Sequence, residues 1–194
     1  MDISDFLEIH IELGDETDQD MLGTAGMDRI FGDLGDDYLA GFDGDDELIG
    51  GQGDDTVLSG AGNDTLLGGI GQDSLFGGAG DDIVYGDDDT DTDYLNGGQG
   101  NDQLQMGEND IASGGSGSDV FYHTTQFGMA EVMDFDPNVD RIVLSAQYTE
   151  LPDIQIIEHK QGCYGVMLND TACLTVHSSA PLSADMIELR TTSA

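Results

Sequence analysis

A nine-residue unit repeats along the chain and limits the fold more than any other feature. Written G-G-x-G-x-D-x-U-x, with U an apolar residue, it fits eleven times in residues 23–122. One unit is too short to bury its own apolar side chain, so the units must stack on one another as a solenoid. The units begin at Gly23, Gly32, Gly41, Gly50, Ser59, Gly68, Gly77, Gly86, Gly97, Met106 and Gly114.

Two positions of the unit keep their character throughout. Position six is always Asp: Asp28, Asp37, Asp46, Asp55, Asp64, Asp73, Asp82, Asp93, Asp102, Asp110 and Asp119. Position eight is always apolar: Ile30, Leu39, Leu48, Val57, Leu66, Leu75, Val84, Leu95, Leu104, Ala112 and Phe121. A disordered low-complexity linker does not hold an apolar residue at one phase in this way. The repeat therefore predicts a folded array.

The residue types of the unit point to cation binding. Gly at positions one, two and four permits positive φ and brings backbone carbonyls close together. Hard cations such as Ca²⁺ take carboxylate and carbonyl oxygens together. The three residues after the Asp are expected to form a short strand with position eight pointing inward.

The charge balance indicates which partners are excluded. Acidic residues number 41 against 4 Lys and Arg, a formal net charge of −37. Such a surface repels nucleic acid and anionic membranes, and no apolar run is long enough for a membrane span. Because 38% of residues are hydrophobic and periodic, we expect folding that depends on a divalent cation.

The repeat resembles the calcium-binding nonapeptide of the repeats-in-toxin (RTX) family. That resemblance implies an all-β, right-handed parallel β-roll solenoid, with two units in each coil and alternate strands in two sheets. It also implies Ca²⁺ ions between turns two units apart, bridged by their aspartates. One edge of the roll would then hold Asp28, Asp46, Asp64, Asp82, Asp102 and Asp119, and the other Asp37, Asp55, Asp73, Asp93 and Asp110.

About nine calcium sites follow from this bridging scheme. Units 86–96 and 106–113 depart from the unit length, which leaves sites that use Asp93 or Asp110 open. The expected carbonyl ligands are those of Gly41, Gly50, Gly68, Gly77 and Gly97. The additional acids at position five are expected to be solvated charge rather than ligands: Asp36, Asp45, Asp54 and Asp81.

The flanks of the array differ from it in composition. Residues 1–22 form a lead-in whose alternating segment 6–13 predicts a half-buried strand or an amphipathic cap on the open end of the roll. Residues 123–194 are expected to form a β-rich C-terminal cap, with a turn at Asp136-Pro137-Asn138. Asp134, Asp136 and Asp140 suggest either a plain turn, which we favour, or one more calcium site.

The C-terminal segment bears on export. Its pattern "DF…DRI.LS" is similar to the segment that follows the repeats in many RTX proteins, and the later HSSAPLSADMIEL is similar to the end of such modules. The resemblance implies a secreted, extracellular protein exported by type I secretion machinery with an uncleaved C-terminal signal. The first residues lack the basic and apolar regions of a Sec-type signal peptide.

No catalytic motif of a zinc protease, serine hydrolase or P-loop enzyme occurs, and the four histidines are scattered: His10, His123, His159 and His177. The segment 163–176 predicts a hairpin with Asn169-Asp170 as its turn. In that hairpin Val166 opposes Cys173 and Cys163 lies on the other face, so free thiols are favoured over a disulfide.

Two functions remain. The first is a non-catalytic module that binds calcium and folds with it outside the cell. The second is the C-terminal secretion and folding domain of an exoenzyme, such as a serralysin-like protease, a lipase or a polysaccharide epimerase. Residues 1–22 are too few for a catalytic domain, so the second function requires a longer protein.

Position nine points outward from the roll but is often apolar. Phe31, Ile49, Leu67 and Tyr85 are expected to form a stripe on one sheet, with Leu58 and Phe76 on the other. Apolar stripes of this kind often mark a contact surface. Three explanations stay open: a cover supplied by the ends of the chain, a homo-oligomer interface, or simple exposure.

Overall fold

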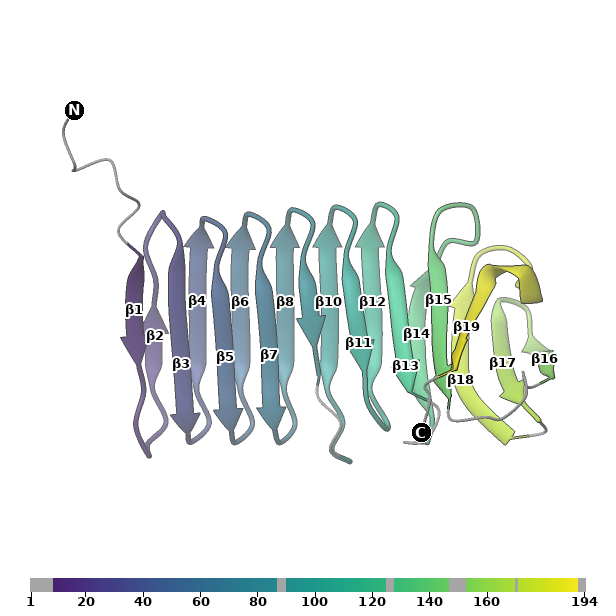
Figure 1. The fold of residues 1–194 in the computed structure, drawn as a ribbon, viewed down its shortest axis with the longest axis horizontal. Helices are drawn as coiled ribbons and strands as arrows, with labels where there is room; N and C mark the ends of the chain where they lie inside the picture. Colours follow the sequence, from purple (N-terminus) through teal and green to yellow (C-terminus); the bar gives the residue numbers. More distant parts are fainter. Residues whose placement is uncertain (1–8, 87–89, 125–127, 147–152, 170, 192–194) are drawn as a thin grey trace.

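The structure is a computed structural model that describes residues 9–86, 90–124, 128–146, 153–169 and 171–191. In these residues the chain forms nineteen strands and one short 3-10 turn, Ala184–Met186. The strands stack as a parallel solenoid of two facing sheets, with the N-terminal strands at one end and the C-terminal cap at the other (Figure 1). The predicted all-β, parallel β-roll is confirmed.

The two sheets take alternate strands of the array. The nine-stranded sheet contains, in order, β1 (His10–Leu13), β3 (Asp28–Leu34), β5 (Glu47–Gln52), β7 (Thr65–Ile70), β9 (Ile83–Tyr85), β11 (Gln103–Met106), β13 (Val120–Thr124), β15 (Arg141–Ala146) and β19 (Ile187–Thr191). The ten-stranded sheet contains β2 (Asp20–Leu22), β4 (Tyr38–Asp43), β6 (Thr56–Ala61), β8 (Ser74–Ala79), β10 (Tyr94–Gln99), β12 (Ile111–Ser116), β14 (Ala130–Phe135), β18 (Thr171–Ser178), β17 (Cys163–Leu168) and β16 (Ile154–Lys160).

The register makes two units one coil. Leu48 on β5 lies beside Leu66 on β7, two units further along. Where a unit is longer, the ladder still holds: Leu75 on β8 pairs with Leu95 on β10. The irregular lengths of two units are therefore taken up in the turns and not in the strands.

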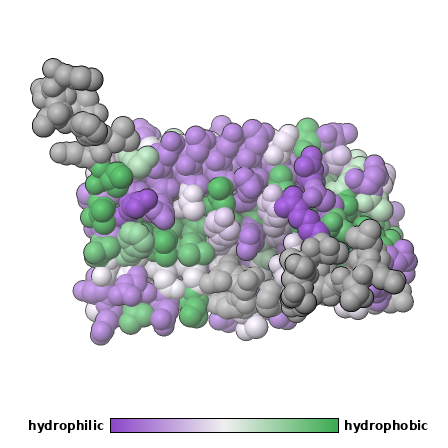
Figure 2. Space-filling view, in the orientation of Figure 1, coloured by the Kyte–Doolittle hydropathy of each residue, from purple (hydrophilic) through white to green (hydrophobic). Residues whose placement is uncertain are grey.

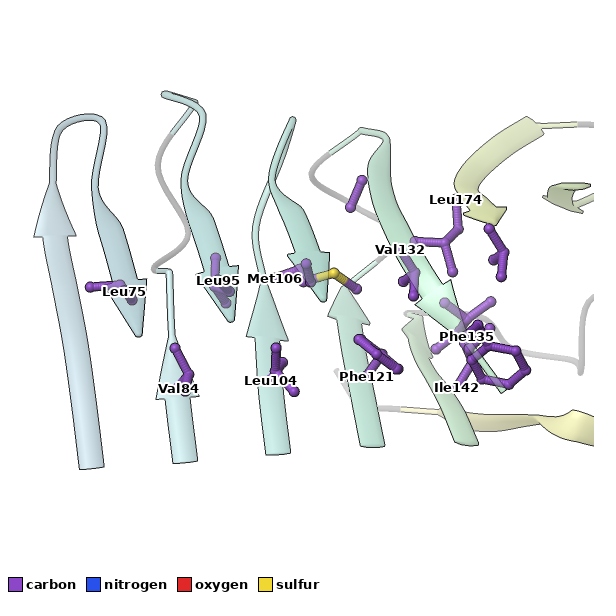
Figure 3. Close-up of a cluster of buried hydrophobic side chains, with 14 of the residues drawn as sticks. Leu75, Val84, Leu95, Leu104, Met106, Phe121, Val132, Phe135, Ile142 and Leu174 are labelled. Atoms are coloured by element: carbon purple, nitrogen blue, oxygen red, sulfur yellow. The ribbon is translucent and has the colours of Figure 1, made fainter. Parts of the chain in front are cut away.

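The core of the roll consists of the position-eight side chains, which meet between the sheets. All eleven are fully buried, at 0% exposure. Figure 3 shows several of them pointing into this interior, among them Leu75, Val84, Leu95 and Leu104. Each coil thus buries two apolar side chains, which a single unit could not do.

The glycines of the unit have two different roles, which corrects one expectation. Positions two and four have positive φ, for example Gly51 at 124° and Gly53 at 130°. Position one, as at Gly50, does not have positive φ; it is Gly because a Cβ there would lie 2.3 Å from Oδ2 of Asp55. The strands also extend further than expected, from position seven through position three of the next unit, as in β5.

The apolar side chains of the lead-in strand point outward, whereas the position-eight side chains of the core strands point inward. In β1, Glu12 pairs with Ile30, the inward position, while Ile11 and Leu13 are 58% and 72% exposed. Residues 6–8 of the predicted strand lie outside the described residues. The apolar face of β1 therefore continues the outer face of the roll and does not cap its core.

Residues beyond the array continue both sheets. β14 pairs with β12, and β15 pairs with β13, so the C-terminal segment adds to the roll before the antiparallel strands β16–β18 follow. Phe121 and Phe135 pack in the core at this end, with ring centroids 6.2 Å apart. The predicted turn is present: the N–H of Asp140 donates to the carbonyl of Asp136 at 2.8 Å.

The predicted hairpin is present as β17 and β18, although Asp170 of its turn lies outside the described residues. Its register differs from the expectation. Val166 pairs with Leu174, because a bulge takes Cys173 out of the ladder. Cys163 and Cys173 are both buried free thiols, as favoured from the sequence.

No helix in the described residues is long and apolar enough to cross a membrane.

Candidate metal-binding site

The position-six aspartates form two buried columns, one along each edge of the roll. All eleven are at most 3% exposed. In each column one carboxylate oxygen, Oδ1, accepts a hydrogen bond from the backbone of the preceding coil. The N–H of Asp46, for example, donates to Oδ1 of Asp64 at 2.8 Å, and the N–H of Asp37 to Oδ1 of Asp55 at 2.8 Å. The structure thus places the predicted ligands in the two expected rows.

The other carboxylate oxygen, Oδ2, distinguishes the site from a purely structural ladder. Among the described residues, seven of these oxygens are buried without a hydrogen-bond partner: those of Asp37, Asp46, Asp55, Asp64, Asp82, Asp102 and Asp119. A buried carboxylate oxygen without a donor is costly unless a cation faces it. The oxygens fit a hard cation by type and by charge.

Backbone carbonyls converge on the same places. A Cβ built at Gly41 would lie 2.3 Å from Oδ2 of Asp46 and 2.8 Å from the carbonyl oxygen of Ser59. At Gly77 it would lie 2.4 Å from Oδ2 of Asp82 and 2.6 Å from the carbonyl oxygen of Gly97. Carboxylate and carbonyl oxygens therefore gather beside position one in successive coils.

Four of the five predicted carbonyls have this placement: those of Gly41, Gly50, Gly68 and Gly97 lie beside position one of the coil before. The carbonyl of Gly77 accepts the hydroxyl of Ser59 instead. The carbonyl of Ser59 belongs to the same set, and the sequence analysis missed it because Ser59 breaks the glycine pattern.

The aspartates at two column ends already have donors on both oxygens. Oδ1 of Asp28 lies 2.9 Å from Nδ1 of His10, and its Oδ2 accepts the N–H of Thr24 at 2.7 Å. Oδ1 and Oδ2 of Asp110 accept the N–H groups of Asp93 and Gly107. These two carboxylates need no cation to satisfy them.

Asp140 extends the first column by one coil. Its Oδ1 accepts the N–H of Asp119 at 3.0 Å, and its Oδ2 accepts the N–H of Asp136 at 2.7 Å. The segment Asp140-Arg141-Ile142-Val143 has the D-x-U-x pattern of the repeat, with Ile142 fully buried. That pattern is the signal that could have identified it.

The suggested cluster of Asp134, Asp136 and Asp140 does not form. Asp134 accepts from the N–H groups of Gly114 and Gly115, and Asp136 caps Asn138 at 2.9 Å. In the described part of the chain no three His, Cys, Asp or Glu side chains gather as a metal cluster. A metal ion in the columns would therefore depend on pairs of carboxylates together with carbonyls.

Burial makes several of the column carboxylates weaker acids in the absence of metal. Desolvation raises the pKa of Asp82 to about 7, and that of Asp46, Asp55 and Asp119 to about 6. Backbone N–H donors oppose this increase, and neighbouring aspartates add to it. The columns thus favour a proton or a metal ion over a bare negative charge.

The position-five side chains, which are exposed, also form a second ladder of hydrogen bonds outside the first. Oδ1 of Asp36 accepts the N–H of Asp54 at 2.9 Å, and Oδ1 of Asp45 accepts the N–H of Asn63 at 2.8 Å. These acids remain exposed, and each ties its own coil to the next. The ladder explains why Asp or Asn recurs at this position.

The histidines do not converge with the columns, apart from His10 at the first column's end. His177 pairs with Glu131, and His159 is exposed on β16. His123 is buried at 1% exposure, outside either aspartate column.

Comparisons with known proteins agree with this architecture. A family model described as the RTX calcium-binding nonapeptide repeat matches four times, at residues 22–57, 58–92, 92–104 and 106–123, which together span just over half of the chain. No curated protein matches.

Two solved structures match the chain at low identity and low TM-score. The AlgE6R3 subunit from the Azotobacter vinelandii mannuronan C5-epimerase is 22% identical, with 90% of this chain and 79% of that chain covered and a TM-score of 0.29. The extracellular lipase LipA from Serratia marcescens is 15% identical, with a TM-score of 0.40. The match covers 94% of this chain but only 40% of the lipase chain.

The stacked coils and their two rows of buried aspartates define a calcium-binding β-roll. The chain belongs to the RTX calcium-binding nonapeptide repeat family.

Proposed function

We propose that the chain is a secreted, non-catalytic module that folds when Ca²⁺ binds between its coils. Position-six carboxylates of successive coils hold the ions, together with the carbonyls that gather beside position one. The observation that carries this proposal is the set of seven buried Oδ2 atoms without a hydrogen-bond donor among the described residues.

Calcium binding would supply the free energy of folding. Residues 23–122 contain 23 acids and one cation, Arg29, so stacking the coils without metal brings like charges together. Binding that requires a preformed site contributes directly to folding. Extracellular calcium modules bind with Kd values of about 10⁻⁴–10⁻³ M, far above cytosolic calcium, so folding would follow export. Type I secretion machinery is the export partner that we propose.

We expect about seven ions rather than the nine of the bridging scheme. The pairs Asp28/Asp46 and Asp93/Asp110 each include an aspartate whose two oxygens already have donors. The seven other pairs of neighbouring aspartates in the two columns therefore offer the better calcium sites.

Calorimetric calcium titration beside far-UV circular dichroism tests the proposal. We expect little β-structure in excess chelator and a cooperative gain of β-structure as several calcium ions bind. Magnesium is the matched control, because it prefers near-ideal octahedral geometry and keeps its waters. A β-rich spectrum in chelator at pH 7.5, or equal folding with magnesium at the same ionic strength, contradicts specific calcium coupling.

The second candidate is the C-terminal folding and secretion domain of a larger exoenzyme, such as a serralysin-like protease, a lipase or a polysaccharide epimerase. The observation in its favour is the position of β1 and β2, which are the edge strands of the two sheets at the N-terminal end. A preceding domain could join the roll there. The length of the coding sequence upstream of Met1 distinguishes the two candidates.

A further inference from the structure

The few cations of the chain are concentrated on one face of the roll. The chain has 41 acids and 4 Lys and Arg, and three of these four cations lie on the outer face of the nine-stranded sheet. At the outward positions of its described strands, which alternate with the buried ones, the charged residues are Arg29, Arg141, Arg190, Asp33, Glu47 and Glu188. Three positive and three negative charges make this face neutral in a molecule of net charge −37. Two copies of an acidic chain can approach each other there at the lowest electrostatic cost.

Apolar side chains form a row on the N-terminal part of this face. Leu13 on β1 lies beside Phe31 on β3, and the row continues through Ile49 and Leu67 to Tyr85. We call this row the outer stripe, and Figure 2 shows a band of hydrophobic surface over it. An open hollow of about 580 Å³ lies beside Leu13, Phe31 and Ile49. Exposed apolar surface that is continuous over several strands often marks a contact.

The two rows that flank the outer stripe complement each other in size. Across β3, β5 and β7, the row two residues before the stripe reads Arg29, Glu47 and Thr65, and the row two residues after it reads Asp33, Gly51 and Gly69. A two-fold axis along the stripe exchanges its two sides, so the first row of each copy faces the second row of the other. Glu47 and Thr65 would then face glycines, which leave room for their side chains.

The same axis also pairs opposite charges. In these three strands the one acid of the second row, Asp33, lies on the same strand as the one arginine of the first row, Arg29, with Phe31 between them. Rotation about the stripe therefore brings Arg29 of each copy over Asp33 of the other. Arg29 is half exposed, and its Nε lies 2.9 Å from Oε2 of Glu47. Its guanidinium has further N–H groups for a second carboxylate.

We propose that this face joins two copies of the chain in a two-fold dimer whose axis runs along the outer stripe. The two stripes pack on each other, and two pairs between Arg29 and Asp33 fix the register of the copies. The inference goes beyond calcium binding, since no position-six aspartate lies on this face. Calcium is needed only to keep the roll folded, so the calcium stoichiometry and the molecular mass test the two proposals separately.

Charge reversal in the full chain tests the dimer, with light scattering and sedimentation at several protein concentrations in saturating calcium. We expect the wild type to be a dimer. Arg29→Glu places two pairs of acids across the axis, and Asp33→Lys places two pairs of cations there, so the dissociation constant of each variant should rise about tenfold or more. Mixing the two variants should restore the dimer, because both charge pairs of the mixed dimer are again opposite in sign.

A wild type that is monomeric at every concentration overturns the proposal, and so does a mixture that is no more dimeric than its two components. Circular dichroism in calcium establishes that each variant is folded. If Asp33→Lys does not fold, Ile49→Asp and Leu58→Asp decide. Ile49 lies on the outer stripe, whereas Leu58 has the same position of the unit on β6 of the other sheet. Only Ile49→Asp should lower the mass, and equal masses for these two variants overturn the proposal.

Discussion

The backbone N–H of Asp46 donates to Oδ1 of Asp64, one coil further along, at 2.8 Å. Each central aspartate is therefore both a candidate metal ligand and the acceptor that holds the previous coil. These two roles depend on different properties, since the hydrogen bond needs an oxygen and the metal needs a negative charge. Substitutions can separate them.

Replacing Asp64 by Asn keeps an acceptor oxygen but removes the charge, whereas Asp64→Ala removes both. Because Asp64 has a neighbour on each side, we expect both variants to lose about two calcium ions under the bridging scheme. Asp64→Ala should also destabilise the calcium-loaded roll by about 1–3 kcal/mol, because the N–H of Asp46 is left buried without an acceptor. Isothermal calorimetry and thermal melts measure the two effects.

Asp28→Asn is the control for this pair. Asp28 ends its column and both of its oxygens already have donors, so we expect a loss of one ion at most. Equal calcium losses for Asp28→Asn and Asp64→Asn would contradict bridging between successive coils.

The metal-free roll should become more stable as the pH falls. Burial raises the pKa of Asp82 to about 7 and that of Asp46 to about 6, from 3.8. The folded state thus binds more protons than the unfolded chain between about pH 4 and pH 7, and its stability decreases as the pH rises through this window. In chelator we expect more β-structure at pH 4.5 than at pH 7.5 by circular dichroism. Equal or smaller β-content at pH 4.5 would count against protons replacing metal in the columns.

Gly50→Ala tests the space that position one provides. The added Cβ would lie 2.3 Å from Oδ2 of Asp55 and 2.7 Å from the carbonyl of Gly68. We expect weaker calcium binding and a less stable roll, because the methyl group displaces two candidate ligands. Gly26→Ala is the matched control, since its nearest neighbour would be Thr24 Oγ1 at 3.8 Å. Calcium affinities that fall equally in both variants would contradict a specific steric role for position one.

The outer apolar stripe leads to a prediction about self-association. Leu13 on β1 pairs with Phe31, and the ladder continues through Ile49 and Leu67 to Tyr85. Figure 2 shows a band of hydrophobic surface over this part of the roll. In the described residues β1 therefore lengthens the stripe instead of covering it.

Leu67→Asp places a charge in the middle of this stripe. If two copies associate through it, we expect a folded, calcium-bound variant of lower mass than the wild type by light scattering. Thr65→Asp adds the same charge two residues away on β7, outside the stripe, and should change the mass less. A wild-type chain that is monomeric in calcium would exclude this role for the stripe.

The sequence predicted the repeating part of the fold because its two columns have a physical cause that acts in every unit. Leu48 and Leu66 are buried for the same reason, and Asp46 and Asp64 line the same edge. The role of Gly50 was only partly predicted. Its glycine is required by a neighbouring carboxylate, and that contact is visible only when the coils are stacked.

The ends of the array were harder to predict, because there the pattern stops and individual contacts decide. His10 takes the place of an aspartate in the register, and its ring lies beside Asp28. Asp140 continues the first column after a segment, residues 120–139, that contains a single glycine, Gly128. Apolar alternation in β1 suggested a strand but did not reveal that its apolar face points outward, since the period of two is the same for either orientation.

The two hydrogen-bond ladders of the roll run in opposite directions. At position six the N–H of Asp46 requires Asp64 of the following coil, whereas at position five the N–H of Asp54 requires Asp36 of the preceding one. When a coil is added at the N-terminal side, the position-six Oδ1 that accepts its position-six N–H is already present in the following coil. In a coil added at the C-terminal side, the position-six N–H has no acceptor until the next coil forms. The cap is the exception, because Oδ1 of Asp140 accepts the N–H of Asp119, the last aspartate of the first column in the array. For the inner ladder, the cap therefore presents a finished edge.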